Sequence, residues 1–221
     1  MKDSVNISYF GQSFFKIFDK NKILYIDPYK AIGGLSVPSL KDKVDVLLIS
    51  HEHDDHNNRN FASDNTYVIS HPGEYDSTNI LVRGVLSFHD NVNGKDRGEN
   101  VMYSFNFNDV NFVHLGDLGE KELSNEQIDD LGVVNVLFVP VGGHFTIDAK
   151  DAVNVINQLN PNIIIPMHYK TEKLELPLAP VSDFLNEFGG AHEEVDSLKV
   201  DANMFQDEDF ETRVVVLKNS R

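Results

Sequence analysis

Short apolar runs separated by polar and turn residues make up most of the chain, and they predict strands. Residues 5–10, 14–18 and 23–26 form three such runs, joined by turn residues, which is typical of short consecutive strands. Largely apolar runs at residues 44–49, 133–141 and 163–168 predict strands that are buried on both faces. Further strands are expected at residues 66–70, 80–83, 85–88, 101–107, 110–114 and 213–217.

Few stretches predict helices. Residues 148–159 repeat apolar side chains at helical spacing, which indicates an amphipathic helix over one face of a sheet. Another helix is expected to begin at Ser124 and to end before Gly132, and residues 57–61 and 180–188 complete the set. This order of elements fits an α/β or α+β fold. Because the 221 residues contain no linker-like segment, a single domain over residues 1–221 is expected.

Composition narrows the possible partners and ligands. The 35 acidic and 19 basic residues give a net charge of −16, which disfavours binding to nucleic acid. No apolar run is long enough for a membrane helix, and the first residues lead into a strand, so we expect no membrane partner and a cytoplasmic location. The sequence has no cysteine. A metal site would therefore use histidine and carboxylate ligands, which suit zinc, manganese or iron.

The densest group of metal-binding residue types follows the apolar run at residues 44–49. There the chain reads Ser-His-Glu-His-Asp-Asp-His over residues 50–56. While the backbone stays extended, side chains two apart lie on the same side, so His51 and His53 can converge on one cation. Asp55 and His56 come after the chain turns and can offer ligands to a second cation about 3.5–4 Å from the first. A strand that ends in three histidines favours a metal site over a solvated polar loop.

On this motif the chain resembles the metallo-β-lactamase superfamily. Four other segments, one before the motif and three after it, occur in the same order along the chain as in that family. They are Ile-Asp-Pro at 26–28, His89 after the strand at 85–88, Gly-Asp at 116–117 and Met-His-Tyr at 167–169. The residues at 72–75, 97–100 and 141–143 are most similar to a branch of metal-dependent hydrolases related to ascorbate-6-phosphate lactonase. The resemblance implies a four-layer αββα sandwich, with the site at the edge between two β-sheets.

The resemblance also implies a centre with two cations, expected as Zn²⁺ with Mn²⁺ or iron as alternatives. Its ligands would be His51, His53 and His89 for the first cation, Asp55, His56 and His168 for the second, and Asp117 for both. Asp55 and Asp117 are also expected to be catalytic, with Asp117 positioning the cations and receiving a proton. His114 lies inside a strand and is expected to pack beneath the site without binding a cation.

Several polar residues near these motifs have two interpretations. Arg97 is either a forked donor to an anionic substrate or the partner of an acidic neighbour. His144 either lines the substrate pocket or lies exposed in its loop, and Lys170 either meets an anionic group or is a surface lysine. Asp27 either starts a turn or orients a metal ligand. Gln12 stands where relatives often carry histidine, and no site role is assigned to it.

The expected function is that of a metal-dependent hydrolase. A dinuclear centre would generate a metal-bound hydroxide near neutral pH, and this hydroxide would attack a small ester, lactone or phosphoester, which could be anionic. Two alternatives come from other classes. One is a phosphodiesterase or nuclease of the same fold, which the charge of −16 disfavours for long polymers. The other is a non-catalytic metal-binding or ligand-sensing domain, against which the complete ligand set counts.

Overall fold

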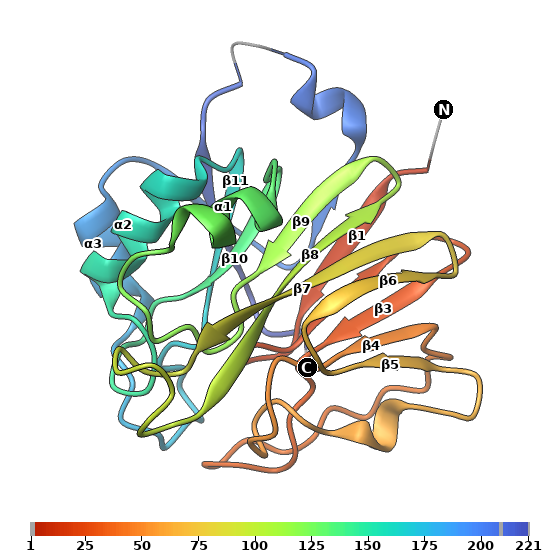
Figure 1. Cartoon of the computed structure of the whole chain (residues 1–221), viewed down its shortest axis with the longest axis horizontal. Helices are drawn as coiled ribbons and strands as arrows, with labels where there is room; N and C mark the ends of the chain where they lie inside the picture. The colour runs from red at the N-terminus through yellow and green to blue at the C-terminus, as the bar shows by residue number, and fades with distance from the viewer. Residues whose placement is uncertain (1–2, 208–209, 221) are drawn as a thin grey trace.

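Two β-sheets face each other across the main core (Figure 1). The computed structural model describes residues 3–207 and 210–220. Within them, the first sheet has the order β13 (Leu198–Val200), β1 (Val5–Tyr9), β2 (Phe15–Phe18), β3 (Ile23–Ile26), β4 (Val46–Leu48) and β5 (Tyr67–Ile69). The pairs from β13 to β3 are antiparallel, whereas β3, β4 and β5 run parallel. The carboxyl ends of β3 and β4 therefore meet at one edge of this sheet.

The second sheet holds the strands that follow. Its order is β12 (His192–Val195), β14 (Arg213–Leu217), β11 (Ile163–Met167), β10 (Val136–Pro140), β9 (Val110–His114), β8 (Glu99–Phe107), β7 (Ile80–Phe88) and β6 (Gly73–Ser77). The strands from β6 to β9 are antiparallel, and those from β9 to β12 are parallel. The carboxyl ends of β9 and β11 thus lie at the same edge of this sheet.

Helices cover the outer face of the second sheet (Figure 1). They are α1 (Asn125–Leu131), α2 (Ala149–Leu159) and α3 (Val181–Phe188). Ser124 and Gln127 form a capping box that begins α1. The apolar side of α2 buries Ala152, Val155 and Ile156, which belong to the same apolar cluster as the strands of the second sheet. Among the described residues, no helix is both long and apolar enough to cross a membrane.

The outer face of the first sheet is covered differently. Within the described residues, loops and a 3₁₀ turn at Arg59–Phe61 lie over it, and they bury a second apolar cluster that includes Tyr29, Leu35 and Leu174. The expected mixed α/β sandwich is thus confirmed. Its fourth layer consists largely of loops because residues 28–45 and 171–179 supply the apolar side chains that a helix would otherwise supply.

Several strand boundaries differ from those expected from the sequence. Residues 80–83 and 85–88 form one continuous strand, β7, because Gly84 is not a break. A Cβ at Gly84 would lie 2.7 Å from the carbonyl oxygen of His71, so glycine is needed there for close backbone approach. The sequence interpretation missed β6, β12 and β13, and it missed the 3₁₀ turn at Ala202–Phe205. Strands β12 and β13 are short, and β12 is largely polar, so they carry little apolar signal.

Candidate metal centre

Five strand ends bring polar side chains to one edge of the sandwich. Residues 50–56 follow β4, and Asp27 follows the neighbouring β3. In the opposite sheet, His89 follows β7, Asp117 follows β9, and His168 follows β11. These residues are far apart in sequence, but the parallel strands deliver them to the same place.

His51, His53 and His89 form the first cluster, and each has a ring nitrogen within 4.8 Å of the others. The Nε2 atom of His51 lies 2.9 Å from Nδ1 of His53, and their rings are nearly perpendicular. The His89 ring centroid lies 4.8 Å from that of His51. His51 and His89 are buried, whereas His53 is exposed, so this cluster opens towards solvent.

Asp55, His56, Asp117 and His168 form the second cluster, again with one ligand atom each within 4.8 Å of the others. This cluster is more deeply buried, and the Asp55 side chain is its most accessible member at 14%. Asp117 also reaches the first cluster, because its Oδ2 atom lies 3.2 Å from Nε2 of His89 and 3.4 Å from Nε2 of His168. One carboxylate therefore borders both clusters.

The donor atoms of the second cluster fit a cation. Nε2 of His56 and Oδ1 of Asp117 lie 3.1 Å apart and are buried, and within residues 3–207 and 210–220 neither atom makes a hydrogen bond. Burial opposes the charge on both groups, yet nearby carboxylates raise the pKa of His56, and nearby histidines lower the pKa of Asp117. Positive charge is thus favoured at this point. A divalent cation held by nitrogen and oxygen ligands would supply it and would displace the imidazole proton.

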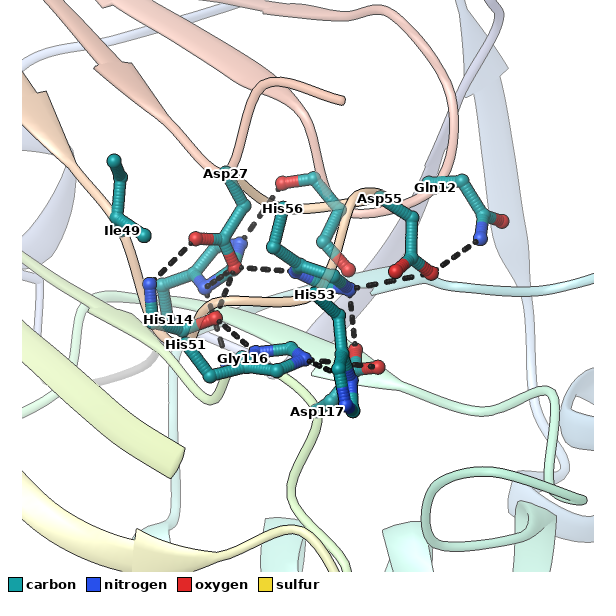
Figure 2. A network of polar contacts seen from close by, with 12 residues as sticks. Gln12, Asp27, Ile49, His51, His53, Asp55, His56, His114, Gly116 and Asp117 are labelled. Atoms are coloured by element: carbon teal, nitrogen blue, oxygen red, sulfur yellow. Dashed lines mark hydrogen bonds and ion pairs between the residues drawn. The ribbon is translucent and has the colours of Figure 1, made fainter. Parts of the chain in front are cut away.

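Asp27 orients the His56 ring, so it does more than start a turn. Its Oδ1 atom accepts a hydrogen bond from the Ser50 backbone N–H at 2.7 Å, and its Oδ2 atom accepts one from Nδ1 of His56 at 2.8 Å and one from the Ser50 hydroxyl at 2.6 Å. Burial opposes ionisation of Asp27, but His56, His114 and Ser50 outweigh it and hold the pKa below its ordinary value. Figure 2 shows the Asp27 and Asp117 carboxylates on different sides of the His56 ring. The bond fixes the His56 ring with Nε2 towards the cluster.

His114 lies beneath the site, as expected from its position inside β9. Its Nε2 atom donates to the carbonyl oxygen of Ser13 at 3.1 Å, and its Nδ1 atom accepts from the Gly116 N–H at 3.1 Å. Both ring nitrogens are therefore engaged. Burial lowers the pKa of His114 to about 4, so the ring is neutral near pH 7.

Asn100 holds Asp117 in place, and the sequence interpretation missed it. Its Oδ1 atom accepts from the Asp117 N–H at 2.9 Å, and its Nδ2 atom donates to the Leu115 carbonyl at 2.9 Å and to the Ser87 hydroxyl at 2.7 Å. Gly116 makes this possible, since a Cβ there would lie 2.3 Å from Oδ1 of Asn100. In the sequence, Asn100 is a polar residue at the start of an apolar strand. Many strands without a functional site begin in this way, so the pattern did not single it out.

Asp90 organises the loop that follows His89. Its carboxylate accepts backbone N–H bonds from Val92, Gly94, Asp96 and Arg97 at 2.8–2.9 Å. Burial opposes ionisation, but these four donors lower the pKa of Asp90 to about 2. The loop is thereby fixed by a charged group that the sequence interpretation did not single out.

Arg97 projects from this loop between two hollows that adjoin the first cluster. One hollow, of about 290 Å³, is lined by His89 and His144 among others, and the second, of about 360 Å³, by His51, His53 and His71. The Arg97 guanidinium lies 4.9 Å from the Phe145 ring centroid and donates to the His144 carbonyl at 3.5 Å. Within the described residues no carboxylate pairs with it.

The other two residues expected at the substrate differ in placement. His144 lines the smaller hollow, is exposed, and has a left-handed backbone with φ of 60°. Lys170 lines neither hollow, and its ammonium donates to the Leu176 carbonyl at 3.0 Å. His71 is absent from both histidine clusters, although it borders the larger hollow.

Comparisons with known proteins agree with this arrangement. The family described as "Beta-lactamase superfamily domain" matches residues 6–168. A metal-dependent hydrolase of Thermococcus onnurineus is 27% identical to this chain, and the match covers 76% of this chain and 85% of the relative. A metal-dependent hydrolase of Staphylothermus marinus is 29% identical, and the match covers 75% of this chain and 83% of the relative. A solved Thermotoga maritima structure of the metallo-β-lactamase superfamily has a TM-score of 0.78 and 34% identity, and covers 96% of this chain and 98% of its own. Together with the two histidine clusters, these matches place the chain among the metal-dependent hydrolases of the metallo-β-lactamase superfamily.

Proposed function

We propose that the protein hydrolyses a small ester, lactone or phosphoester at a dinuclear centre. The observation that carries this proposal is the position of Asp117. Its buried carboxylate lies 3.2 Å from His89 of the first cluster and 3.1 Å from His56 of the second. A carboxylate that touches both clusters is suited to bridge two cations.

The proposed ligands are His51, His53, His89, Asp117, Asp55, His56 and His168, in the two sets described above. When bound, two Zn²⁺ ions, or Mn²⁺ or iron in their place, would activate water and stabilise developing negative charge. Asp117 and Asp55 are the proposed catalytic carboxylates. Asp117 would orient the centre and receive a proton at Oδ1, which has no hydrogen-bond partner in the described part of the chain. Asp55 borders the same space and is partly accessible to solvent.

Arg97 is the proposed contact to an anionic substrate. Its backbone is fixed by Asp90, its guanidinium packs on the Phe145 ring, and no described acidic side chain neutralises it. A preorganised guanidinium binds carboxylate or phosphate oxygens at a low cost in entropy. His144 borders the same hollow and is a second proposed contact. Lys170 stays a weaker proposal, because its ammonium already donates to a carbonyl outside the hollows.

Small molecules fit the two hollows better than polymers do. The volumes of about 290 and 360 Å³ suit a compact ligand. A net charge of −16 opposes the approach of a long nucleic acid. A phosphodiesterase acting on small substrates is the second candidate, since Arg97 would serve a phosphodiester as well as a carboxylate. The likeness to the ascorbate-6-phosphate lactonase branch and the expected single domain over residues 1–221 stay predictions.

Elemental analysis and substrate profiling test the proposal together. Protein purified without chelator should carry close to two transition-metal ions per chain, and it should hydrolyse lactones, carboxylesters or bis-phosphodiesters. A metal content near zero that does not rise after zinc or manganese is added would contradict the dinuclear centre. Bound metal without turnover of any of these substrate classes would favour the metal-binding or ligand-sensing alternative.

Replacing Arg97 tests the anionic substrate. Arg97→Ala should raise KM for an anionic substrate by about 10–100-fold with little change in kcat, because a contact made equally in the ground and transition states contributes to binding alone. KM for a neutral lactone should change little. Arg83→Ala is the matched control, since Arg83 pairs with Glu74 and Asp130 away from both hollows. Equal changes in KM for charged and neutral substrates would remove Arg97 from the substrate site.

A further inference from the structure

The turn between β1 and β2 places the side chain of Gln12 against the second cluster. Gln12 is 1% exposed, and its backbone is left-handed with φ of 52°. Its Nε2 atom lies 3.3 Å from Oδ2 of Asp55 and 3.4 Å from Nε2 of His168. Figure 2 shows the amide nitrogen turned towards the Asp55 carboxylate. A residue outside the proposed ligand set thus contacts two of its members.

The chemistry of these neighbours defines how the amide is oriented. An ionised carboxylate only accepts hydrogen bonds, so the amide group must face Asp55 with its N–H. The opposite orientation would set two oxygen atoms against each other. The bond also goes to the Asp55 oxygen that lies nearest the other donors, because Oδ2 is 3.6 Å from Nε2 of His56 and 3.6 Å from Nε2 of His168. Gln12 therefore restrains the very oxygen that would bind a cation.

The main chain of Gln12 is fixed from the opposite side. Its carbonyl oxygen accepts from the His168 backbone N–H at 2.9 Å and from the Tyr9 hydroxyl at 3.0 Å. One residue thus holds the backbone of His168 and the side chain of Asp55. These two groups follow strands of different sheets and are far apart in sequence, and Gln12 connects them.

The amide has a cost for the metal-free protein. Its Oε1 atom is buried, and no described residue donates a hydrogen bond to it. A buried acceptor without a partner destabilises the fold, and an apolar side chain of similar size would avoid this penalty. Folding alone therefore does not account for an amide here, whereas the bond to Asp55 does.

We propose that Gln12 is a positioning residue of the second cation site. Its Nε2–H group holds Oδ2 of Asp55 towards His56 and His168, so that the four donors are arranged before the cation binds. Hydrogen bonds to ligating carboxylates typically raise metal affinity in this way. This inference rests on the proposed function, in which Asp55, His56, Asp117 and His168 hold the second cation.

Zinc titration of the metal-free protein tests this role without an activity measurement. Isothermal calorimetry should resolve two binding steps in the wild type. Gln12→Leu removes the donor, and the second step should weaken by about 10–100-fold while the first step stays unchanged. The thermal midpoint of metal-free Gln12→Leu should stay close to that of the wild type, because removal of the unpaired oxygen offsets the loss of the bond to Asp55. A residue with a purely structural role would instead lower this midpoint.

Ser13→Ala is the matched control. Ser13 is the next residue of the same turn. Its hydroxyl is buried, has no hydrogen-bond partner among the described residues, and belongs to neither cluster. Both binding steps should match those of the wild type. A loss of second-site affinity as large as that of Gln12→Leu would show that any change in this turn disturbs the site, and it would overturn the inference.

Gln12→Glu separates a donor from a ligand, and it serves if Gln12→Leu does not fold. A carboxylate at this position cannot donate to Asp55 and repels it, so the second step should weaken. A tighter second step would mean that residue 12 binds the cation through its oxygen, which would overturn the positioning role. Unchanged affinity in Gln12→Leu would overturn it as well. A wild type that binds fewer than two ions would instead overturn the proposed function, a result that the variants do not affect.

Discussion

Replacing Asp27 with asparagine should switch the His56 ring to the wrong tautomer. In the wild type, Nδ1 of His56 donates to Oδ2 of Asp27 at 2.8 Å, which leaves Nε2 free to bind a cation. Asparagine can keep its oxygen opposite the Ser50 backbone N–H. Its NH₂ group then faces Nδ1 of His56, and two donors oppose each other. His56 avoids this conflict by carrying its proton on Nε2, where it blocks coordination.

The size of the effect follows from these contacts. Loss of a partner that orients a metal-binding histidine typically weakens metal affinity by about 10–100-fold, which corresponds to about 1.4–2.8 kcal/mol. The wild-type Oδ2 atom accepts two hydrogen bonds, from Ser50 and His56. The Ser50 hydroxyl can rotate, so only the imidazole bond is lost outright. The free energy of unfolding of the metal-free protein should therefore fall by no more than about 1–3 kcal/mol.

Two measurements check this prediction. Zinc titration should show a weakened second step in Asp27→Asn. With zinc present, nitrogen NMR of labelled imidazoles should show the His56 proton on Nδ1 in the wild type and on Nε2 in the variant. Asp45→Asn is the matched control, because Asp45 accepts a hydrogen bond from the Ile23 backbone N–H at 2.8 Å at the opposite end of the same strands. Unchanged second-site affinity in Asp27→Asn, or a proton that stays on Nδ1, would refute the reasoning.

Three further predictions concern the first cluster and the stability of the fold. His89→Ala should lose one metal ion per chain and nearly all activity, whereas His114→Ala should lose only about 10–100-fold in affinity for the metal ion. Elemental analysis compares the metal content of the two variants, and the reverse ranking would show that the wrong histidine was assigned as ligand. Gly119→Ala should weaken first-site binding, measured by zinc titration, because the added Cβ would lie 2.4 Å from the backbone carbon of His89; wild-type affinity would contradict it. Burial opposes ionisation of Asp42, but the ion pair with Lys16 at 2.7 Å helps to hold its pKa below the ordinary value. Asp42→Asn should therefore lower the free energy of unfolding at pH 7, and this deficit should shrink as pH falls below about 4. The reason is that the stabilisation is complete above the unfolded pKa and is lost as pH falls towards the folded pKa. Urea unfolding at pH 7 and pH 3 measures the deficit, and an equal deficit at both values would contradict the prediction.

The sequence by itself determined the parts that depend on local spacing. A largely apolar run predicted β4, and the spacing of His51 and His53 predicted that they converge, with Nε2 and Nδ1 now found 2.9 Å apart. The backbone at residues 51–53 bends and is not extended as the prediction assumed, but the two side chains still meet. Both statements need only the geometry of a few consecutive residues. The helical spacing of residues 148–159 predicted α2 for the same reason. The assignment of His89 to the first cluster came from family resemblance, because a single histidine after a strand has no local pattern.

Only the tertiary structure decided which distant residues support the site. Asn100 and Gln12 look like ordinary polar residues in the sequence, yet Asn100 fixes the Asp117 backbone and Gln12 contacts Asp55. Likewise, Arg97 could have paired with any of 35 acidic residues, but the loop anchored by Asp90 holds it on the Phe145 ring. Such contacts depend on the packing of two sheets and on which loop crosses which strand end. Hydrophobic periodicity fixes the face on which a side chain lies, but it carries no information about the partner that side chain meets across the core.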